Sequence, residues 1–299
     1  MRRDIEFATS DGVTLRGWLI TPEQGGGPFP CVVMAHGFSA VKELFLDRYA
    51  EIFAAAGLAC VVYDHRNFGA SDGAPRLEAD PWLQVQGYRD AITFASLQPE
   101  IDRARIGVWG TSYSGGHVLP VAALDKRVKA VVSQVPFISG LQNMRRVFRE
   151  EEVEGLRARF DADREARFQG GAPAMLPVFA EAGATCALPS PEEWAFIRDS
   201  GLLGTDMWLN EVTLRSAEMM MAYEPGQYIE QIMPAPLLMI VTTRDIVTPT
   251  DIALDAFKRA HAPKELMLVE GGHMEVYDAQ FDRGSAAARD WLARHLGAG

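Results

Sequence analysis

The run GTSYSGG contains the residue best placed for nucleophilic catalysis, Ser112. An apolar segment, RIGVW, precedes this run and another, HVLPVAAL, follows it, so we expect Ser112 at a sharp turn from a strand into a helix. Such a turn places the hydroxyl at the positive end of the helix dipole, where an oxyanion would form. The turn needs small residues two positions before and after the serine, and these are Gly110 and Ser114. The alternatives are that Ser112 only caps the helix, or that Ser114 is the nucleophile.

A serine hydroxyl is a weak nucleophile near neutral pH, so it needs a base to take its proton and a carboxylate to orient that base. His273 is the candidate base, because it lies in the glycine-flanked run GGHMEVY directly after the last expected strand. Asp245 is the candidate acid, since it follows the apolar run PLLMIV, whereas Asp251 falls in the first turn of a helix expected from about Thr250. Structural or surface positions are expected for the remaining histidines: His36, His65, His117, His261 and His295.

The tetrahedral intermediate of such a reaction carries a negative oxygen that two backbone N–H groups can hold. One donor is expected directly after the nucleophile, at Tyr113. The other is expected in the loop that follows the apolar run CVVMA, at Phe38. In that loop Gly37 allows the backbone to approach closely, and His36 is expected to orient the turn.

Short apolar runs alternate with segments of helical length, which is typical of a parallel sheet covered by helices on both faces. The residues at 5–8 and 13–20, joined by a Ser-Asp-Gly turn, predict an antiparallel hairpin at one edge. Further strands are expected at 31–35, 59–63, 105–109, 130–135, 236–241 and 265–270. Helices are expected at 44–56, 84–97 and 250–261, and a closing helix that ends at 296 follows the last strand. The sequence thus predicts a doubly wound sheet in two blocks.

The pattern changes between these blocks, and we expect residues 137–232 to form a helical cap, or lid, on a core made of 1–136 and 233–299. Inserted there, the cap would lie over the carboxyl ends of the strands, where open α/β sheets bind ligands. Its apolar side chains pack on the core or line the cavity, which favours an apolar acyl or aromatic substrate. A cluster of acids could bind a substrate ammonium, although a solvated helix face explains it more simply: Glu151, Glu152 and Glu154.

Composition narrows the class of partner. The 299 residues include 29 Lys and Arg against 40 Asp and Glu, a formal net charge of -11, so we expect no nucleic-acid partner. The 3 cysteines have no CxxC spacing, and we expect no disulfide framework, metal or cofactor. No run approaches the roughly 20 apolar residues of a membrane span, so we expect a cytoplasmic protein without a membrane partner. An exposed apolar cap face could mediate a homodimer.

Taken together, these motifs resemble those of the α/β-hydrolase superfamily. HGF, DHRNFGASDG, WGTSYSGG, the strand before Asp245 and GGH occur in that family's order, as do Ser112, Asp245 and His273. The resemblance implies an α/β-hydrolase fold with a mostly parallel, eight-stranded sheet and a helical lid. It also implies a structural role for the loop at 64–72, in which Asn67 stands where glycine is usual.

The sharp turn at Ser112, called an elbow in this superfamily, contains a Ser-Tyr pair. This pair is similar to that in the GxSYxG motif of the Xaa-Pro dipeptidyl-peptidase and cocaine-esterase branch, and the chain also resembles dienelactone-hydrolase-like proteins. In the peptidase branch a tyrosine hydroxyl contributes to the oxyanion hole from the loop after strand three, where this chain has Phe38. Because the sequence ends soon after His273, we expect no C-terminal jelly-roll domain of the kind those enzymes carry. We therefore transfer the catalytic residues from the resemblance but not the peptide substrate.

The expected activity is that of a serine hydrolase, a carboxylesterase acting on a small-molecule ester through an acyl-enzyme. Hydrolysis of a carbon-carbon bond in a polyketide-like or diketone substrate, or of an amide or thioester, uses the same residues and stays open. A hydrolase-fold protein that only binds its ligand is the non-enzymatic alternative.

Overall fold

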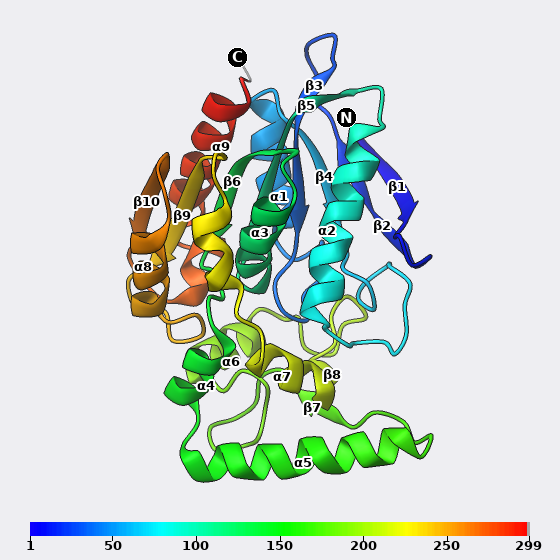
Figure 1. The fold of residues 1–299 in the computed structure, drawn as a ribbon, viewed down its shortest axis with the longest axis vertical. Coiled ribbons are helices and arrows are strands. Elements are labelled where there is room, and N and C mark those ends of the chain that lie inside the picture. The colour runs from blue at the N-terminus through cyan, green and yellow to red at the C-terminus, as the bar shows by residue number, and fades with distance from the viewer. Residues whose placement is uncertain (298–299) are drawn as a thin grey trace.

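The computed structural model describes residues 1–297, and its centre is an eight-stranded sheet with the order β1-β2-β4-β3-β5-β6-β9-β10 (Figure 1). The β1–β2 and β2–β4 pairs are antiparallel, and every other neighbouring pair is parallel. The strands are β1 Arg2–Ala8, β2 Thr14–Ile20, β3 Phe29–Ala35, β4 Ala59–Tyr63, β5 Ile101–Thr111, β6 Val128–Gln134, β9 Leu237–Thr242 and β10 Lys264–Val269. The predicted fold class, including the antiparallel edge hairpin, is confirmed.

Helices cover both faces of the sheet, and this explains why its central strands are almost wholly apolar. One buried cluster joins the sheet to α1 and α9, and the other joins it to α2, α3 and α8. These helices are α1 Leu46–Ala55, α2 Pro81–Ser96, α3 Tyr113–Leu124, α8 Thr250–Arg259 and α9 Phe281–Leu296. Because the parallel strands point the same way, their carboxyl ends meet at one edge, where the loops carrying the candidate residues converge.

A second group of helices lies beyond the carboxyl ends of the strands (Figure 1). It consists of α4 Gly140–Val147, α5 Glu150–Phe168, α6 Pro191–Asp199 and α7 Leu214–Met221, with an antiparallel pair of short strands, β7 Met175–Pro177 and β8 Glu211–Thr213. We call residues 137–222 the cap. The longest helix, α5, is highly charged, and like every other helix in residues 1–297 it is too short or too polar to cross a membrane.

Two features divide the helices of the cap. Phe148 and Arg149 have extended backbones, so the charged segment divides into α4 and α5, and the Arg149 N–H donates to Glu152 to begin the second helix. In the region 191–221, β8 separates α6 from α7.

The domain boundaries stay a prediction. A 3-10 helix, η1 Pro225–Gln231, packs on α3 of the core, and the Gly226 N–H donates to the Ile138 carbonyl. This segment was expected to belong to the cap, and it contacts both parts, since α3 belongs to the core and Ile138 belongs to the cap.

Candidate active site

Ser112 lies at the turn between β5 and α3, as the sequence predicts. Its backbone has φ 57° and ψ -118°, a strained conformation that L-residues rarely adopt and that serine elbows of this kind use. Gly110 is required two positions earlier, because a Cβ atom there would lie 2.1 Å from the carbonyl oxygen of Ser114. The strand and the helix can therefore cross closely only with glycine at this position.

A continuous chain of hydrogen bonds joins the three candidate catalytic residues. Ser112 Oγ lies 3.0 Å from His273 Nε2, and His273 Nδ1 lies 2.7 Å from Asp245 Oδ2. When the hydrogen on Nδ1 is donated to Asp245, Nε2 has a lone pair with which to accept the Ser112 proton. Asp245 and His273 are each 5% exposed, so water competes little for these bonds. The structure thus brings all three residues together.

The Asp245 carboxylate is fixed by groups of its own loop. Its Oδ1 accepts the backbone N–H groups of Val247 at 2.9 Å and Thr248 at 2.8 Å. The Thr248 hydroxyl lies 2.9 Å from Asp245 Oδ2 and 3.3 Å from His273 Nδ1. We call residues 245–248 the acid loop. Thr248 was not singled out from the sequence, and its position three residues after the acid is the signal that could have identified it.

Two opposing influences act on the protonation of His273. Burial is the larger single cause and lowers its pKa, but the charge and hydrogen bond of Asp245, together with the charge of Glu193, outweigh it. The net result is a pKa above the ordinary histidine value of 6.5. The imidazolium formed when the Ser112 proton is accepted is thereby stabilised.

Glu193, in α6 of the cap, is the second carboxylate near His273. It is 2% exposed, and its carboxylate accepts a hydrogen bond from Ser190. Burial raises the pKa of Glu193, while His273 acts in the opposite direction. Nothing in the sequence distinguishes Glu193 from Glu192 beside it, because only tertiary packing buries Glu193 and leaves Glu192 exposed.

The expected oxyanion donors lie next to Ser112. A Cβ atom on Gly37 would lie 3.0 Å from the Ser112 Cβ, so glycine lets the loop after β3 approach the nucleophile closely. Tyr113 is the first residue of α3, so its N–H has no acceptor within the helix. Within residues 1–297 the Phe38 N–H makes no backbone hydrogen bond. Neither amide is therefore engaged by a backbone acceptor in this part of the chain, as the predicted role of oxyanion donor requires.

Ser114 does not compete as a nucleophile, because it is fully buried and its hydroxyl is engaged. Its Oγ donates to the His36 carbonyl at 2.5 Å and lies 2.8 Å from His65 Nε2. His36 in turn accepts the His65 N–H on Nε2 at 3.0 Å. Together these bonds join α3, the loop after β3 and the loop after β4, which agrees with the structural roles expected for the two histidines.

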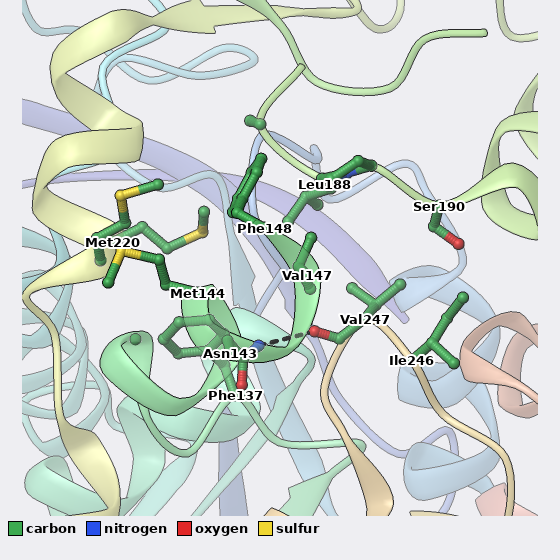
Figure 2. Close-up of a pocket in the computed structure, with 14 residues that line it drawn as sticks. Phe137, Asn143, Met144, Val147, Phe148, Leu188, Ser190, Met220, Ile246 and Val247 are labelled. Atoms are coloured by element: carbon green, nitrogen blue, oxygen red, sulfur yellow. Dashed lines mark hydrogen bonds between the residues drawn. The ribbon is translucent and has the colours of Figure 1, made fainter. Parts of the chain in front are cut away.

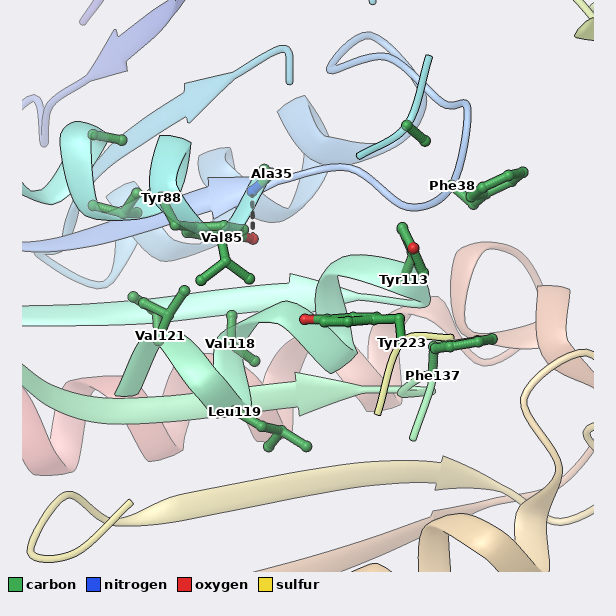
Figure 3. Close-up of a cluster of buried hydrophobic side chains, with 14 of the residues drawn as sticks. Ala35, Phe38, Val85, Tyr88, Tyr113, Val118, Leu119, Val121, Phe137 and Tyr223 are labelled. Atoms are coloured by element: carbon green, nitrogen blue, oxygen red, sulfur yellow. Dashed lines mark hydrogen bonds between the residues drawn. The ribbon is translucent and has the colours of Figure 1, made fainter. Parts of the chain in front are cut away.

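An aromatic cluster supports the elbow from behind (Figure 3). The rings of Phe38 and Tyr113 meet edge to face with centroids 5.3 Å apart, and Tyr113 makes a similar contact with Phe137 at 5.2 Å. Deeper in the core, the Tyr88 hydroxyl accepts the Ala35 N–H and donates to the Trp109 carbonyl, so it bridges β3 and β5. Strand β3 leads into the loop that contains Phe38, and β5 leads into Ser112, so these two strands are fixed to each other. We call residues 36–39 the oxyanion loop.

A small pocket opens onto Ser112 and His273, and we call it the catalytic pocket. It offers about 90 Å³ to the centres of water-sized molecules. The cap forms one wall of it, and the Trp208 indole N–H donates to the Ser39 carbonyl in the loop after β3 at 3.0 Å. The cap residues that line it are apolar: Phe179, Leu188, Ile197, Leu202 and Trp208.

The other acids weighed from the sequence lie outside this arrangement. Asp251 is in the first turn of α8 and forms an ion pair with Arg146. The three acids on α5 are exposed: Glu151, Glu152 and Glu154.

The loop at 64–72 has the structural part expected of it. The Asp64 carboxylate accepts the Lys42 N–H and ammonium, each at 2.7 Å, and the Ala70 N–H at 2.9 Å. Asn67 adopts φ 72°, a left-handed conformation that asparagine tolerates better than most residues, which explains how it replaces glycine.

A mostly parallel eight-stranded sheet, with a serine elbow after β5 and a histidine after the last strand, is the architecture of the α/β-hydrolases. A solved structure supports this class. The crystal structure of the α/β-hydrolase GrgF from Penicillium sp. sh18 superposes with a TM-score of 0.86 at 29% sequence identity, covering 99% of each chain. The chain is an enzyme of this class.

Within that class, residues 11–166 match the X-Pro dipeptidyl-peptidase (S15) family, and the chain belongs to it. The resemblance to the Xaa-Pro dipeptidyl-peptidase branch is therefore confirmed. A thiohydrolase of Aspergillus aculeatus, aneE, is 34% identical over 282 residues, which are 89% of this chain and 84% of the relative. A polyketide transferase of Penicillium sp, grgF, is 31% identical over 298 residues, which are 99% of this chain and 97% of the relative.

Proposed function

We propose that this enzyme cleaves the ester or thioester of an apolar acyl group through an acyl-enzyme on Ser112. The observation that carries the proposal is the hydrogen-bonded chain of Ser112, His273 and Asp245 at the floor of a pocket lined by apolar cap residues. The relatives named thiohydrolase and polyketide transferase support an acyl thioester as substrate.

The geometry supports the following steps. Ser112 Oγ attacks the acyl carbonyl while its proton passes to His273 Nε2, and the N–H groups of Phe38 and Tyr113 hold the resulting oxyanion. The tetrahedral intermediate then expels the alcohol or thiol, which leaves with the proton from His273. In the second half, His273 removes a proton from water, the hydroxide adds to the acyl-enzyme carbonyl, and Ser112 regains its proton as the acid departs.

The test of this proposal is Ser112→Ala. Turnover of p-nitrophenyl octanoate, and of the octanoyl thioester of N-acetylcysteamine, is expected to fall roughly a thousandfold or more, because the nucleophile is lost while the amide donors stay. A fluorophosphonate probe should label the wild-type enzyme on Ser112 and leave the variant unlabelled, as read by mass spectrometry. Ser10→Ala, at an exposed serine, is the control and should behave as wild type. Unchanged turnover in Ser112→Ala would refute the mechanism.

A second candidate is transfer of the acyl group to an acceptor other than water. The apolar cap side chains that line the catalytic pocket favour it, because they offer water no hydrogen-bond partner beside the acyl-enzyme. An alcohol or a carbon nucleophile that occupies the pocket would then compete with hydrolysis. Product analysis in the presence of added alcohols distinguishes the two: transfer gives a new ester, and hydrolysis gives the free acid.

A further inference from the structure

A second cavity lies directly beside the catalytic pocket, and we call it the side chamber (Figure 2). Leu188 of the cap and Val247 of the acid loop line both spaces, so they form the partition between them. The other walls of the side chamber come from α4, α7, the cap segment before α6 and the segments after β6 and β9, and include Phe137, Met144, Phe148, Met220 and Ile246.

The lining of the side chamber suits a hydrocarbon. No Lys, Arg, Asp, Glu or His is among its lining residues, and two of them have polar side chains, Asn143 and Ser190; between these two, the buried Asn143 Oδ1 is the one polar side-chain atom without a hydrogen-bond partner in the described residues. The Asn143 amide N–H donates to the Val247 carbonyl at 2.8 Å, and the Ser190 hydroxyl donates to Glu193. A charged or strongly hydrated group placed here would lose its water without gaining a partner of opposite charge.

The side chamber is narrow but its walls can rearrange. It offers about 30 Å³ to the centres of water-sized molecules, whereas about 10–15 Å³ by this measure holds a single water. Three of its lining residues are methionines, whose unbranched side chains change rotamer readily: Met144, Met220 and Met221. An alkyl chain can therefore enter by displacing methionine side chains rather than backbone.

The position of His273 decides which part of the substrate this chamber receives. His273 lines the catalytic pocket but not the side chamber. Because the leaving group takes its proton from His273 Nε2, it must lie on the catalytic-pocket side. We propose that the side chamber is an acyl-chain subsite, which holds the far end of a linear apolar acyl group whose carbonyl lies at Ser112. This inference rests on the proposed acyl-enzyme function.

Met144→Trp tests the subsite, because the indole would fill the side chamber without touching the catalytic residues. The assay compares kcat/KM for p-nitrophenyl acetate, butyrate, octanoate and dodecanoate. In the wild type each methylene that enters the chamber is expected to raise kcat/KM by up to about fourfold. The variant should keep its acetate activity and lose about tenfold or more on dodecanoate. Met175→Trp is the matched control, since Met175 is an exposed cap methionine that lines neither space.

Phe148→Ala enlarges the chamber and provides an independent readout. Phe148 also lines a groove on the outer side of the cap, so its removal lengthens the space toward the surface. Its chain-length optimum should move to longer acyl groups. The subsite is refuted if Met144→Trp lowers acetate and dodecanoate activity equally, if neither variant changes the chain-length profile, or if the alcohol chain of alkyl acetates responds instead. Should the wild type cleave no ester or thioester at all, the proposed function itself is wrong.

Discussion

His273 combines burial, which lowers its pKa, with two carboxylate neighbours that raise it. Only the neutral imidazole can take the Ser112 proton, so kcat/KM falls as the pH drops through the His273 pKa. Because that pKa is raised, the acidic limb of the pH profile lies at a higher pH than an unperturbed histidine would give. Asp245 is required to orient the ring, and Glu193 is therefore the neighbour whose charge can be removed separately.

Glu193→Gln is expected to shift this acidic limb to lower pH. The reason is that the variant loses a negative charge that stabilises the imidazolium, so the pKa of His273 falls and the neutral form persists to lower pH. A kcat/KM profile on p-nitrophenyl octanoate measures the shift, with the alkaline plateau unchanged. Glu192→Gln removes an exposed carboxylate on the same helix turn and should leave the limb in place. Coincident profiles for Glu193→Gln and wild type would contradict the prediction.

At the scale of elements, the proposed mechanism depends on how α3 is held against the loop after β3. The nucleophile begins that helix and the Phe38 amide lies in that loop, so the gap between them sets the geometry of the oxyanion hole. Ser114 Oγ bridges the gap by donating to the His36 carbonyl, and His65 holds the same hydroxyl from the other side. The residue that departs from the GxSxG pattern is thus a positioning residue for the oxyanion loop.

Ser114→Ala is expected to lower kcat by about tenfold while KM changes little, because a displaced oxyanion donor weakens transition-state binding more than ground-state binding. Steady-state kinetics on p-nitrophenyl octanoate separates the two constants. Ser133→Ala is the matched control: this buried serine of β6 donates at 2.6 Å to the Gly115 carbonyl of α3, and its hydroxyl makes no hydrogen bond with the loop after β3 in the described residues. It should lose similar stability, measured by thermal unfolding, yet keep its kcat. Equal kcat losses in both variants would indicate a merely structural role for Ser114.

The sequence predicts the sheet and the elbow better than the cap, and the reason is physical. A central strand such as Ala59–Tyr63 is buried on both faces, so its residues are apolar. The first and last apolar residues of the run therefore predict where the strand begins and ends. In the cap, tertiary contacts determine where helices and strands begin and end. The break between helices at Arg149 and the short strand Glu211–Thr213 therefore have no recognisable pattern of apolar residues. Contacts made only on folding, such as the burial of Glu193 and the hydrogen bond of Ser114, are equally invisible in one sequence.

At the scale of the whole molecule, the loops at the carboxyl edge are held by a buried ion pair. Lys42, after β3, and Asp64, after β4, are 4% and 0% exposed, and their charged groups lie 2.7 Å apart. The Asp64 carboxylate also accepts the backbone N–H groups of Lys42 and Ala70. Because the oxyanion loop lies between β3 and Lys42, this ion pair contributes both to the stability of the fold and to the position of that loop.

Lys42→Met leaves the Asp64 carboxylate buried without its cation, and we expect a loss of about 3–5 kcal/mol in the free energy of unfolding. That is a large part of the roughly 5–15 kcal/mol typical of a folded domain, so the urea midpoint should fall sharply. Lys42→Met combined with Asp64→Asn removes both charges and should recover much of the loss. Lys258→Met breaks an exposed pair with Asp255 and is expected to cost less than about 1 kcal/mol. A double variant no more stable than Lys42→Met would show that the Asp64 charge is not the source of the penalty.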